Sequence, residues 1–276
     1  MVSLFRLLSR LPLPVLHNIG ALAGWLTWLA SPTYRRHLRE NTAQAGLEGA
    51  RLGAIAEAGK AIFELPKIWL RPLAEVSARV VRVTGWQCVE DAWAEGRGIL
   101  FLTPHLGCFE ITAQYYASHR PITVLYRRPK QDWLAPLMEA GRGTNLSLAP
   151  ADLGGVRRLL KGLKHGEAVG LLPDQVPGQG EGIWAPFFGR PAYTMTLAAR
   201  LAETGAVVLL IYAERLHYGA GYHVKVCPLS APLAGSLAER VASLNQELER
   251  LIRQCPEQYL WGYNRYKKPS GAPDPS

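Results

Sequence analysis

The 276-residue sequence has few of the residues that mark metal sites and disulfide frameworks. Its four cysteines are far apart and form no C-x-x-C pair; they are Cys88, Cys108, Cys227 and Cys255. Closely paired cysteines mark zinc sites and a high density of cysteines marks a disulfide scaffold, so we expect free thiols in a reducing compartment. The G-x-S-x-G elbow, the Walker loop and the H-E-x-x-H motif are missing as well. The sequence therefore gives no support to a serine hydrolase, an NTPase or a zinc protease.

Acidic residues are outnumbered, with 22 Asp and Glu against 31 Lys and Arg, and the formal charge is +9. Such a surface attracts anions, whether nucleic acid, anionic lipid or an acidic protein. Zinc-finger spacing, an aromatic-glycine RNA-binding signature and a dense basic helix are all lacking, which argues against a nucleic-acid-binding module. With 48% hydrophobic residues, the chain is long enough for one catalytic domain with an appendage.

An apolar stretch at residues 11–30 lies near the lower length limit for a bilayer-spanning helix, although two prolines, a histidine and an asparagine interrupt it. A basic cluster follows at 35–39, which is unusual just after a signal-peptide cleavage site. We therefore expect a retained membrane anchor at residues 1–34, with Trp25 and Trp28 near the interface and the rest of the chain on the cytoplasmic side. The pattern leaves open whether the segment spans the bilayer or lies in one leaflet.

Apolar runs then alternate with helical patterns. The runs predict strands at 99–103, 122–126, 168–172, 206–214 and 222–229. Residues 154–166 have leucines at helical spacing, Thr194 can cap a helix over 195–203, and Ser236 with Glu239 suggests a capping box. This order predicts an α/β domain over residues 35–268, with a mixed, mostly parallel sheet flanked by helices, and a disordered tail at 269–276.

The segment TPHLGCFEI (103–111) places His105 where the first predicted strand should end. Residues five apart differ by about 140° on a helix, so His105 and Glu110 can meet only if the histidine stands on the turn before the helix. Glu110 would then orient the imidazole, leaving the other nitrogen as a general base. The alternative is a structural histidine at a strand end. We interpret Cys108 as part of the buried start of a helix and not as a nucleophile.

An H-x4-E motif after an apolar strand resembles the catalytic motif of the glycerolipid-type acyltransferases, and more specifically the late acyltransferases of bacterial lipid A biosynthesis. YRRPK (126–130), Gly141-Arg142, the segment 171–194 and the C-terminal block 255–269 are similar to segments of that family in the same order. The likeness covers almost the whole chain. The sequence departs from the family pattern at Tyr263, where the family usually has histidine. This difference leaves the acceptor and the length of the acyl chain open.

The resemblance implies a glycerolipid acyltransferase-like fold and a membrane-bound enzyme of the cell inner membrane, with its catalytic domain on the cytoplasmic side. It would move a fatty acyl chain from acyl-carrier protein to a lipid A precursor, with His105 and Glu110 as catalytic dyad and no metal or organic cofactor. The alternative acceptor is a lysophospholipid, an ornithine lipid or another glycolipid. The expected substrate-binding residues are Arg127, Arg128, Arg142, Asp174, Gln175, Gly189 and Thr194.

Each of these residues also has a plainer interpretation. Arginines can anchor phosphates by bidentate contacts, but they can also form a solvated basic face. Asp174 could position substrate at a strand end or simply cap a turn. Gly189 and the two phenylalanines before it could line an acyl groove or belong to the core.

Overall fold

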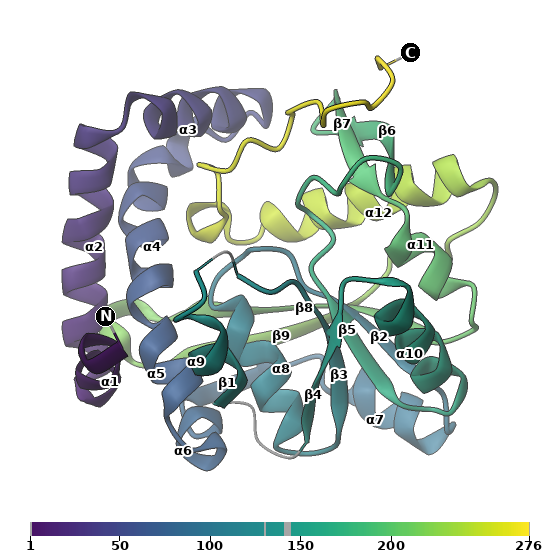
Figure 1. Ribbon diagram of the computed structural model, residues 1–276, viewed down its shortest axis with the longest axis horizontal. Helices are drawn as coiled ribbons and strands as arrows, with labels where there is room; N and C mark the ends of the chain where they lie inside the picture. The colour runs from purple at the N-terminus through teal and green to yellow at the C-terminus, as the bar shows by residue number, and fades with distance from the viewer. Residues whose placement is uncertain (1, 130, 141–144, 276) are drawn as a thin grey trace.

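The computed structural model describes residues 2–129, 131–140 and 145–275. A seven-stranded sheet with the order β1-β9-β8-β2-β5-β3-β4 forms its centre (Figure 1). All neighbouring strands are parallel except β8 and β9. The strands are β1 (Val80–Thr84), β2 (Ile99–Leu102), β3 (Ile122–Tyr126), β4 (Leu146–Pro150), β5 (Ala168–Leu171), β8 (Val207–Arg215) and β9 (Tyr222–Pro228). The prediction of a mixed, mostly parallel α/β sheet is confirmed.

Helices cover both faces of the sheet, because its central strands are apolar on both sides. On one face, Leu100 and Leu102 of β2 join a core with α10 (Leu153–Lys164), α11 (Leu197–Ala202) and α12 (Leu237–Ile252). On the other face, Ile99 and Phe101 join a core with α5 to α8. The remaining helices after β1 are α7 (Gln87–Ala94), α8 (Phe109–Ala117) and α9 (Ala135–Ala140).

Two local predictions are settled by these elements. The capping box of Ser236 and Glu239 is present at the start of α12 and is confirmed. The prediction that Thr194 caps a helix is wrong: Thr194 lies in β7 (Arg190–Met195), and α11 is preceded by Thr196 at its N-cap position. The strand pairs with β6 (Gly182–Phe187) as an antiparallel hairpin, which the prolines in both strands had obscured.

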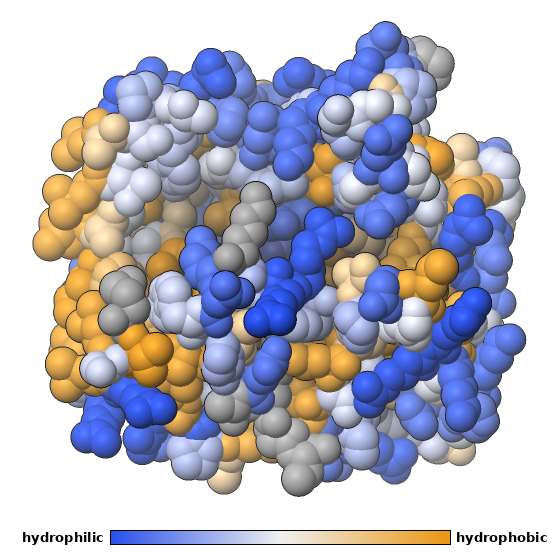
Figure 2. Space-filling view, viewed as in Figure 1, coloured by the Kyte–Doolittle hydropathy of each residue, from blue (hydrophilic) through white to orange (hydrophobic). Residues whose placement is uncertain are grey.

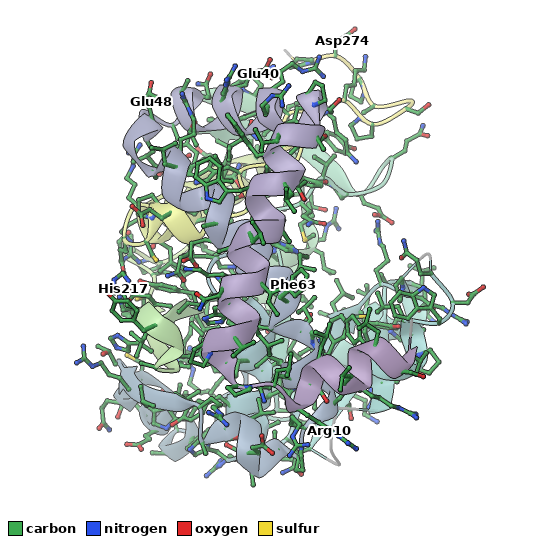
Figure 3. The ribbon with its side chains drawn as sticks, turned by 90° about the vertical axis from the view of Figure 1, so that its left-hand side faces the viewer. Arg10, Glu40, Glu48, Phe63, His217 and Asp274 are labelled. Atoms are coloured by element: carbon green, nitrogen blue, oxygen red, sulfur yellow. The ribbon has the colours of Figure 1, made fainter. Side chains whose placement is uncertain are left out.

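Six helices precede the sheet: α1 (Val2–Arg10), α2 (Leu13–Ala30), α3 (Pro32–Gln44), α4 (Arg51–Phe63), α5 (Leu65–Leu70) and α6 (Leu73–Ser77). Helix α2 is the outermost and lies across α4 (Figures 1 and 3). The two backbones touch where Gly20 and Gly24 face Gly59, since a Cβ on any of the three would collide with the opposite backbone. Within the described part of the chain, no helix combines the length and the apolarity needed to cross a membrane.

The two ends of the expected acyltransferase domain, residues 35 and 268, are not marked by linkers. The boundary at 34/35 falls inside α3, and the described part of the tail contacts the hairpin through Ala272 and through a hydrogen bond from Trp184 Nε1 to the carbonyl of Pro273. The domain limits and the disorder of the tail stay predictions.

A buried ion pair joins the N-terminal helices to the sheet. Glu64, between α4 and α5, accepts hydrogen bonds from Arg215 at the end of β8, with the Oε1 atom 2.7 Å from a terminal guanidinium nitrogen. The hydroxyl of Tyr222 and the ring of His17 also bind Glu64, at 3.0 and 3.2 Å. Burial acts to raise the pKa of Glu64, but the charge and hydrogen bonds of Arg215 and His17 outweigh it and hold that pKa at about 2.

We expect Glu64→Gln to lower the free energy of unfolding at pH 7 by about 3–5 kcal/mol, because it leaves the Arg215 charge buried and uncompensated. The folded-state pKa of Glu64, about 2, lies below the ordinary 4.5. The stabilisation is therefore present above about pH 4.5 and is lost as the pH falls toward about 2. Urea titrations at pH 7 and pH 3 measure both effects, because pH 3 lies well inside the range in which the stabilisation is lost. As a control, Glu95→Gln removes an exposed partner of Arg97 and should cost less than about 1 kcal/mol; equal losses in the two variants would contradict this account.

Candidate active site

The turn between β2 and α8 is held in place from several sides. Gly107 has a φ of +62°, and a Cβ there would collide with the carbonyl oxygen of Ala213. Its N–H donates to the carbonyl of Gln258, while Arg215 donates to its carbonyl at 2.6 Å. His105 lies on this turn and Glu110 in the first turn of α8, as the sequence predicted.

Asp174 is the partner of His105 at the Nδ1 atom. The Oδ1 atom of Asp174 lies 2.8 Å from His105 Nδ1, and Oδ2 accepts the His105 backbone N–H at 2.9 Å. Burial acts to raise the pKa of Asp174, but attraction to His105 and these hydrogen bonds outweigh it, so the pKa is lowered. An ionised carboxylate at Nδ1 favours the tautomer whose Nε2 is unprotonated, as a general base requires.

The pairing follows from sheet register. Strands β2 and β5 are parallel neighbours with Leu102 opposite Leu171. His105 and Asp174 both lie three residues beyond these paired strand ends. The equal offset was visible in the sequence, but using it required knowledge that β2 and β5 are adjacent. Both residues were predicted from the sequence, His105 as a base and Asp174 as a substrate-binding residue, but not as partners of each other.

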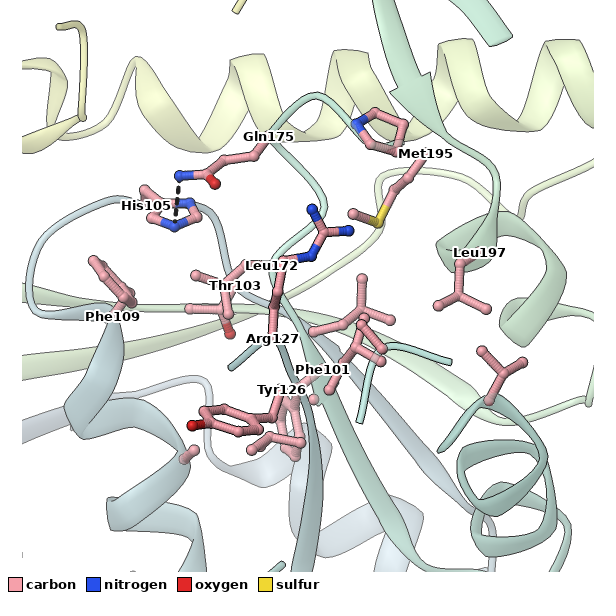
Figure 4. Close-up of a pocket in the computed structure, with 18 of the residues that line it drawn as sticks. Phe101, Thr103, His105, Phe109, Tyr126, Arg127, Leu172, Gln175, Met195 and Leu197 are labelled. Atoms are coloured by element: carbon pink, nitrogen blue, oxygen red, sulfur yellow. Dashed lines mark hydrogen bonds between the residues drawn. The ribbon is translucent and has the colours of Figure 1, made fainter. Parts of the chain in front are cut away.

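The other nitrogen of His105 faces the cavity. The side-chain amide of Gln175 lies 3.1 Å from Nε2 (Figure 4). The loop that carries Gln175 is fixed by the C-terminal block, because the hydroxyl of Tyr263 accepts the N–H of Val176 at 3.0 Å. Tyr263 therefore stabilises this loop. From the sequence, it was known only as a departure from the family pattern.

Glu110 binds a different group. Its Oε2 atom accepts a hydrogen bond from Trp69 Nε1 at 3.0 Å, which links α8 to α5. The residue also lines the cavity beside His105. The expected orientation of His105 by Glu110 stays a prediction, and the hydrogen bond at Nδ1 gives that position to Asp174.

A cavity of about 720 Å³ opens at His105. Figure 4 shows Thr103, Phe101 and Tyr126 on one side of the histidine and Met195 and Leu197 toward α11. Most of its lining is aliphatic or aromatic, and its polar residues include the exposed Arg127 and Arg200 as well as His105 and Gln175. A largely apolar cavity with a few convergent polar groups suits a ligand with a long hydrocarbon portion and one reactive polar end.

The structure brings together only some of the predicted substrate-binding residues. Arg127 and Gln175 line the cavity with His105, and Arg127 has a long ion pair with Glu181, at 3.7 Å between exposed side chains. Arg128 faces Asp132 at 3.7 Å and is not among the lining residues of the described chain. Arg142 lies outside the described residues.

The two remaining predicted residues, Gly189 and Thr194, lie away from the cavity lining as described. Gly189 forms the hairpin turn with a φ of +75°. The buried hydroxyl of Thr194 accepts from Arg265 at 2.7 Å and supports the C-terminal block. Phe187 and Phe188 belong to the core, which favours their plainer interpretation.

Other chemistries find little support at this site. Cys108 is buried, and burial raises the pKa of its thiol well above the ordinary value, so it is a poor nucleophile. Among residues 2–129, 131–140 and 145–275, no cluster of three His, Cys, Asp or Glu side chains could hold a metal ion.

Comparison with known proteins agrees with this geometry. A family profile described as bacterial lipid A biosynthesis acyltransferase matches residues 51–268. The chain is 28% identical to the lipid A biosynthesis lauroyltransferase of Escherichia coli (strain K12), over 99% of this chain and 92% of the relative. It is also 28% identical to the lipid A biosynthesis palmitoleoyltransferase of that organism, over 94% and 87% of the two chains. A lipid A biosynthesis acyltransferase of Haemophilus influenzae is 24% identical over 96% and 88%. The resemblance drawn from the sequence is confirmed: the chain belongs to the bacterial lipid A biosynthesis acyltransferase family and is an acyl-transferring enzyme.

Proposed function

We propose that this protein transfers a fatty acyl chain from acyl-carrier protein to a hydroxyl of a lipid A precursor, with His105 as general base. The observation that carries the proposal is the His105–Asp174 pair at the mouth of a 720 Å³ apolar cavity. The names of the relatives, a lauroyltransferase and a palmitoleoyltransferase of lipid A biosynthesis, support the acceptor class.

In the proposed reaction the acceptor hydroxyl displaces the Gln175 amide and gives its proton to His105 Nε2. The hydroxyl oxygen attacks the thioester carbonyl, and a new C–O bond forms. Collapse of the tetrahedral intermediate then breaks the C–S bond, and the imidazolium returns the proton to the departing thiolate. Asp174 stabilises the imidazolium throughout, and no acyl-enzyme is formed.

The basic residues at the cavity mouth fit the acceptor. Arg127 and Arg200 both line the cavity. Guanidinium groups bind phosphate oxygens in a bidentate manner, so a phosphorylated glycolipid would find its counter-charges here. The 70% exposed Arg127 side chain leaves its ion pair with Glu181 weak and easily exchanged for a phosphate.

The outer face of the N-terminal helices fits a membrane surface at the cytoplasmic side of the inner membrane. Leu22, Leu26 and Leu29 of α2 are 57–62% exposed, and Leu4 and Leu7 of α1 continue the apolar face. Figure 2 shows hydrophobic side chains along the edge of the molecule where α1 and α2 lie. A contiguous apolar face flanked by arginines favours docking into an anionic leaflet.

We expect His105→Ala to lower acyl transfer at least about a hundredfold, the usual loss on removal of a general base. The assay uses purified protein, acyl-carrier-protein donors and a tetra-acylated lipid A precursor, with His165→Ala on the exposed end of α10 as the matched control. Undiminished activity in His105→Ala would refute the catalytic role. Transfer by wild type to a lysophospholipid, an ornithine lipid or another glycolipid, but not to the precursor, would refute the acceptor.

Asp174 and Glu110 are both candidates for the partner of His105. Double mutants distinguish them, because the losses in kcat from two groups that act as one unit do not add. We expect Asp174→Asn to lower kcat at least about a hundredfold and to cost almost nothing further in a His105→Ala background, because the two groups act as one unit. Glu110→Gln tested in the same background is the comparison. If Glu110→Gln causes no further loss of kcat in the His105→Ala background while Asp174→Asn does, the expected His105–Glu110 dyad is right and our assignment of Asp174 is wrong.

For the membrane surface, we expect Leu22→Gln, Leu26→Gln and Leu29→Gln together to weaken binding to anionic phospholipid vesicles at least about a hundredfold, because each leucine contributes on the order of 1 kcal/mol. Vesicle sedimentation measures the change. Leu153→Gln is the control, because this leucine is 77% exposed on α10, away from α2. Equal binding by the triple variant and wild type would refute docking through α2.

A further inference from the structure

One glycine in the cavity wall, Gly170, faces side chains and not backbone where its Cβ would lie. Gly170 is the third residue of the fully buried strand β5. Its φ is not positive, and among the described residues no backbone atom approaches within 4 Å of where its Cβ would lie. The atoms in reach are side-chain methyls, Val124 Cγ1 at 3.2 Å and Ile122 Cδ1 at 3.6 Å. Gly20 and Gly24 contrast with it, since backbone blocks a Cβ there.

A glycine inside a strand weakens the strand, so a missing side chain at such a place often marks close approach by a ligand. Gly170 lies directly between Phe101 and Val124 on the adjacent strands. All three residues line the cavity. They form a row across the sheet. This row lies two residues, or roughly 7 Å, further back along the strands than Thr103, which follows the end of β2.

Helix α8 closes this part of the cavity from the other side. Ala113 and Tyr116 line it from the helix, opposite Phe101 and Gly170; we call the space between them the inner arm. Tyr116 is rigidly held, because its hydroxyl accepts from Trp93 Nε1 at 2.9 Å and its ring packs edge-on against Phe101 at 5.0 Å. The inner arm thus has a fixed aromatic end.

We propose that the inner arm holds the acyl chain being transferred and that Gly170 sets how long a chain it accepts. The proposal rests on the function proposed above. In Figure 4, Thr103 lies below His105 and Phe101 below Thr103, so the arm leads away from the base. A thioester carbonyl placed at His105 needs an apolar space for its chain on that side.

The transferred chain, not a chain of the acceptor, fits the arm best. The acceptor's fatty chains can stay in the leaflet while one hydroxyl reaches His105. The donor chain has to leave its carrier and reach the active site without contact with water. An apolar arm lined by Phe101, Ala113 and Tyr116 provides that, and each methylene that it buries strengthens binding about fourfold.

The test compares wild type with Gly170→Ala and Gly170→Val, given a mixture of acyl-carrier-protein donors from about ten to sixteen carbons and the tetra-acylated precursor. Valine suits a buried parallel strand, but a Cβ here would lie 3.2 Å from Val124 Cγ1, so thermal unfolding is measured first and the donor assay uses the variants that are folded. We expect the longest donor that wild type uses to lose at least about tenfold relative to the shortest, and valine to have the larger effect. The shortest donor is the internal control, because a chain that stops before Gly170 should not sense the substitution.

Several outcomes would overturn the proposal. They are an unchanged length distribution, an equal loss for every donor in folded protein, and a shift that follows acceptor chain length instead. Binding of free fatty acids of the same lengths, followed by calorimetry, tests the arm without turnover. If wild type acylates nothing but binds fatty acids with a length limit that Gly170→Val shortens, the proposed reaction fails while the arm stands. Length-independent binding would refute the arm.

Discussion

The buried ion pair of Arg215 and Glu64 connects the N-terminal helices to the turn that carries His105. The proposed function needs these two parts of the molecule close together. The side chains of Arg215 and Glu64 are 2% and 1% exposed. Arg215 also holds the carbonyl of Gly107 in the catalytic turn, and Glu64 holds His17 of the outermost helix. Burying two charges is costly unless the geometry is good and the remaining hydrogen bonds are satisfied. The pair therefore tolerates little displacement, and it fixes the helices bearing the outer leucines relative to the base.

A second set of contacts fixes the loop that carries Asp174 and Gln175. The side chain of Asn41 in α3 donates to the carbonyls of Trp261 and Tyr263, at 2.7 and 2.8 Å. Tyr263 in turn accepts the N–H of Val176. An aromatic hydroxyl fills this role as well as a histidine nitrogen would, since either can accept one backbone hydrogen bond. The substitution relative to the family pattern is thus compatible with an intact loop.

The sequence was sufficient where local pattern decides structure. Apolar runs located the central strands β2, β3, β5, β8 and β9 to within one or two residues, and the glycine and proline around His105 predicted its place on a turn. It was insufficient where a partner lies far along the chain. The edge strand β1 is half exposed and lacks the apolar run of a buried strand. The pairing of His105 with Asp174 spans 69 residues and depends on which strands are neighbours, which no single-chain pattern encodes.

The location of the negative charge supports the proposal that His105 acts as a base beside an apolar cavity. Transfer of a proton to Nε2 creates an imidazolium, which an apolar site would penalise. Asp174 is only 2% exposed, and burial acts to raise its pKa, but attraction to His105 and hydrogen bonds from the His105 ring and backbone N–H outweigh burial and lower it. In the proposed reaction, proton transfer would place the imidazolium in an ion pair with Asp174, with Nδ1 and Oδ1 2.8 Å apart. Arg265, buried nearby, contributes to lowering the pKa of Asp174 and so helps to stabilise the carboxylate before the proton arrives. Arg265 and the hydrogen bonds from His105 thus oppose the effect of burial on Asp174 in the resting state. In the proposed reaction, the imidazolium would stabilise the buried carboxylate further.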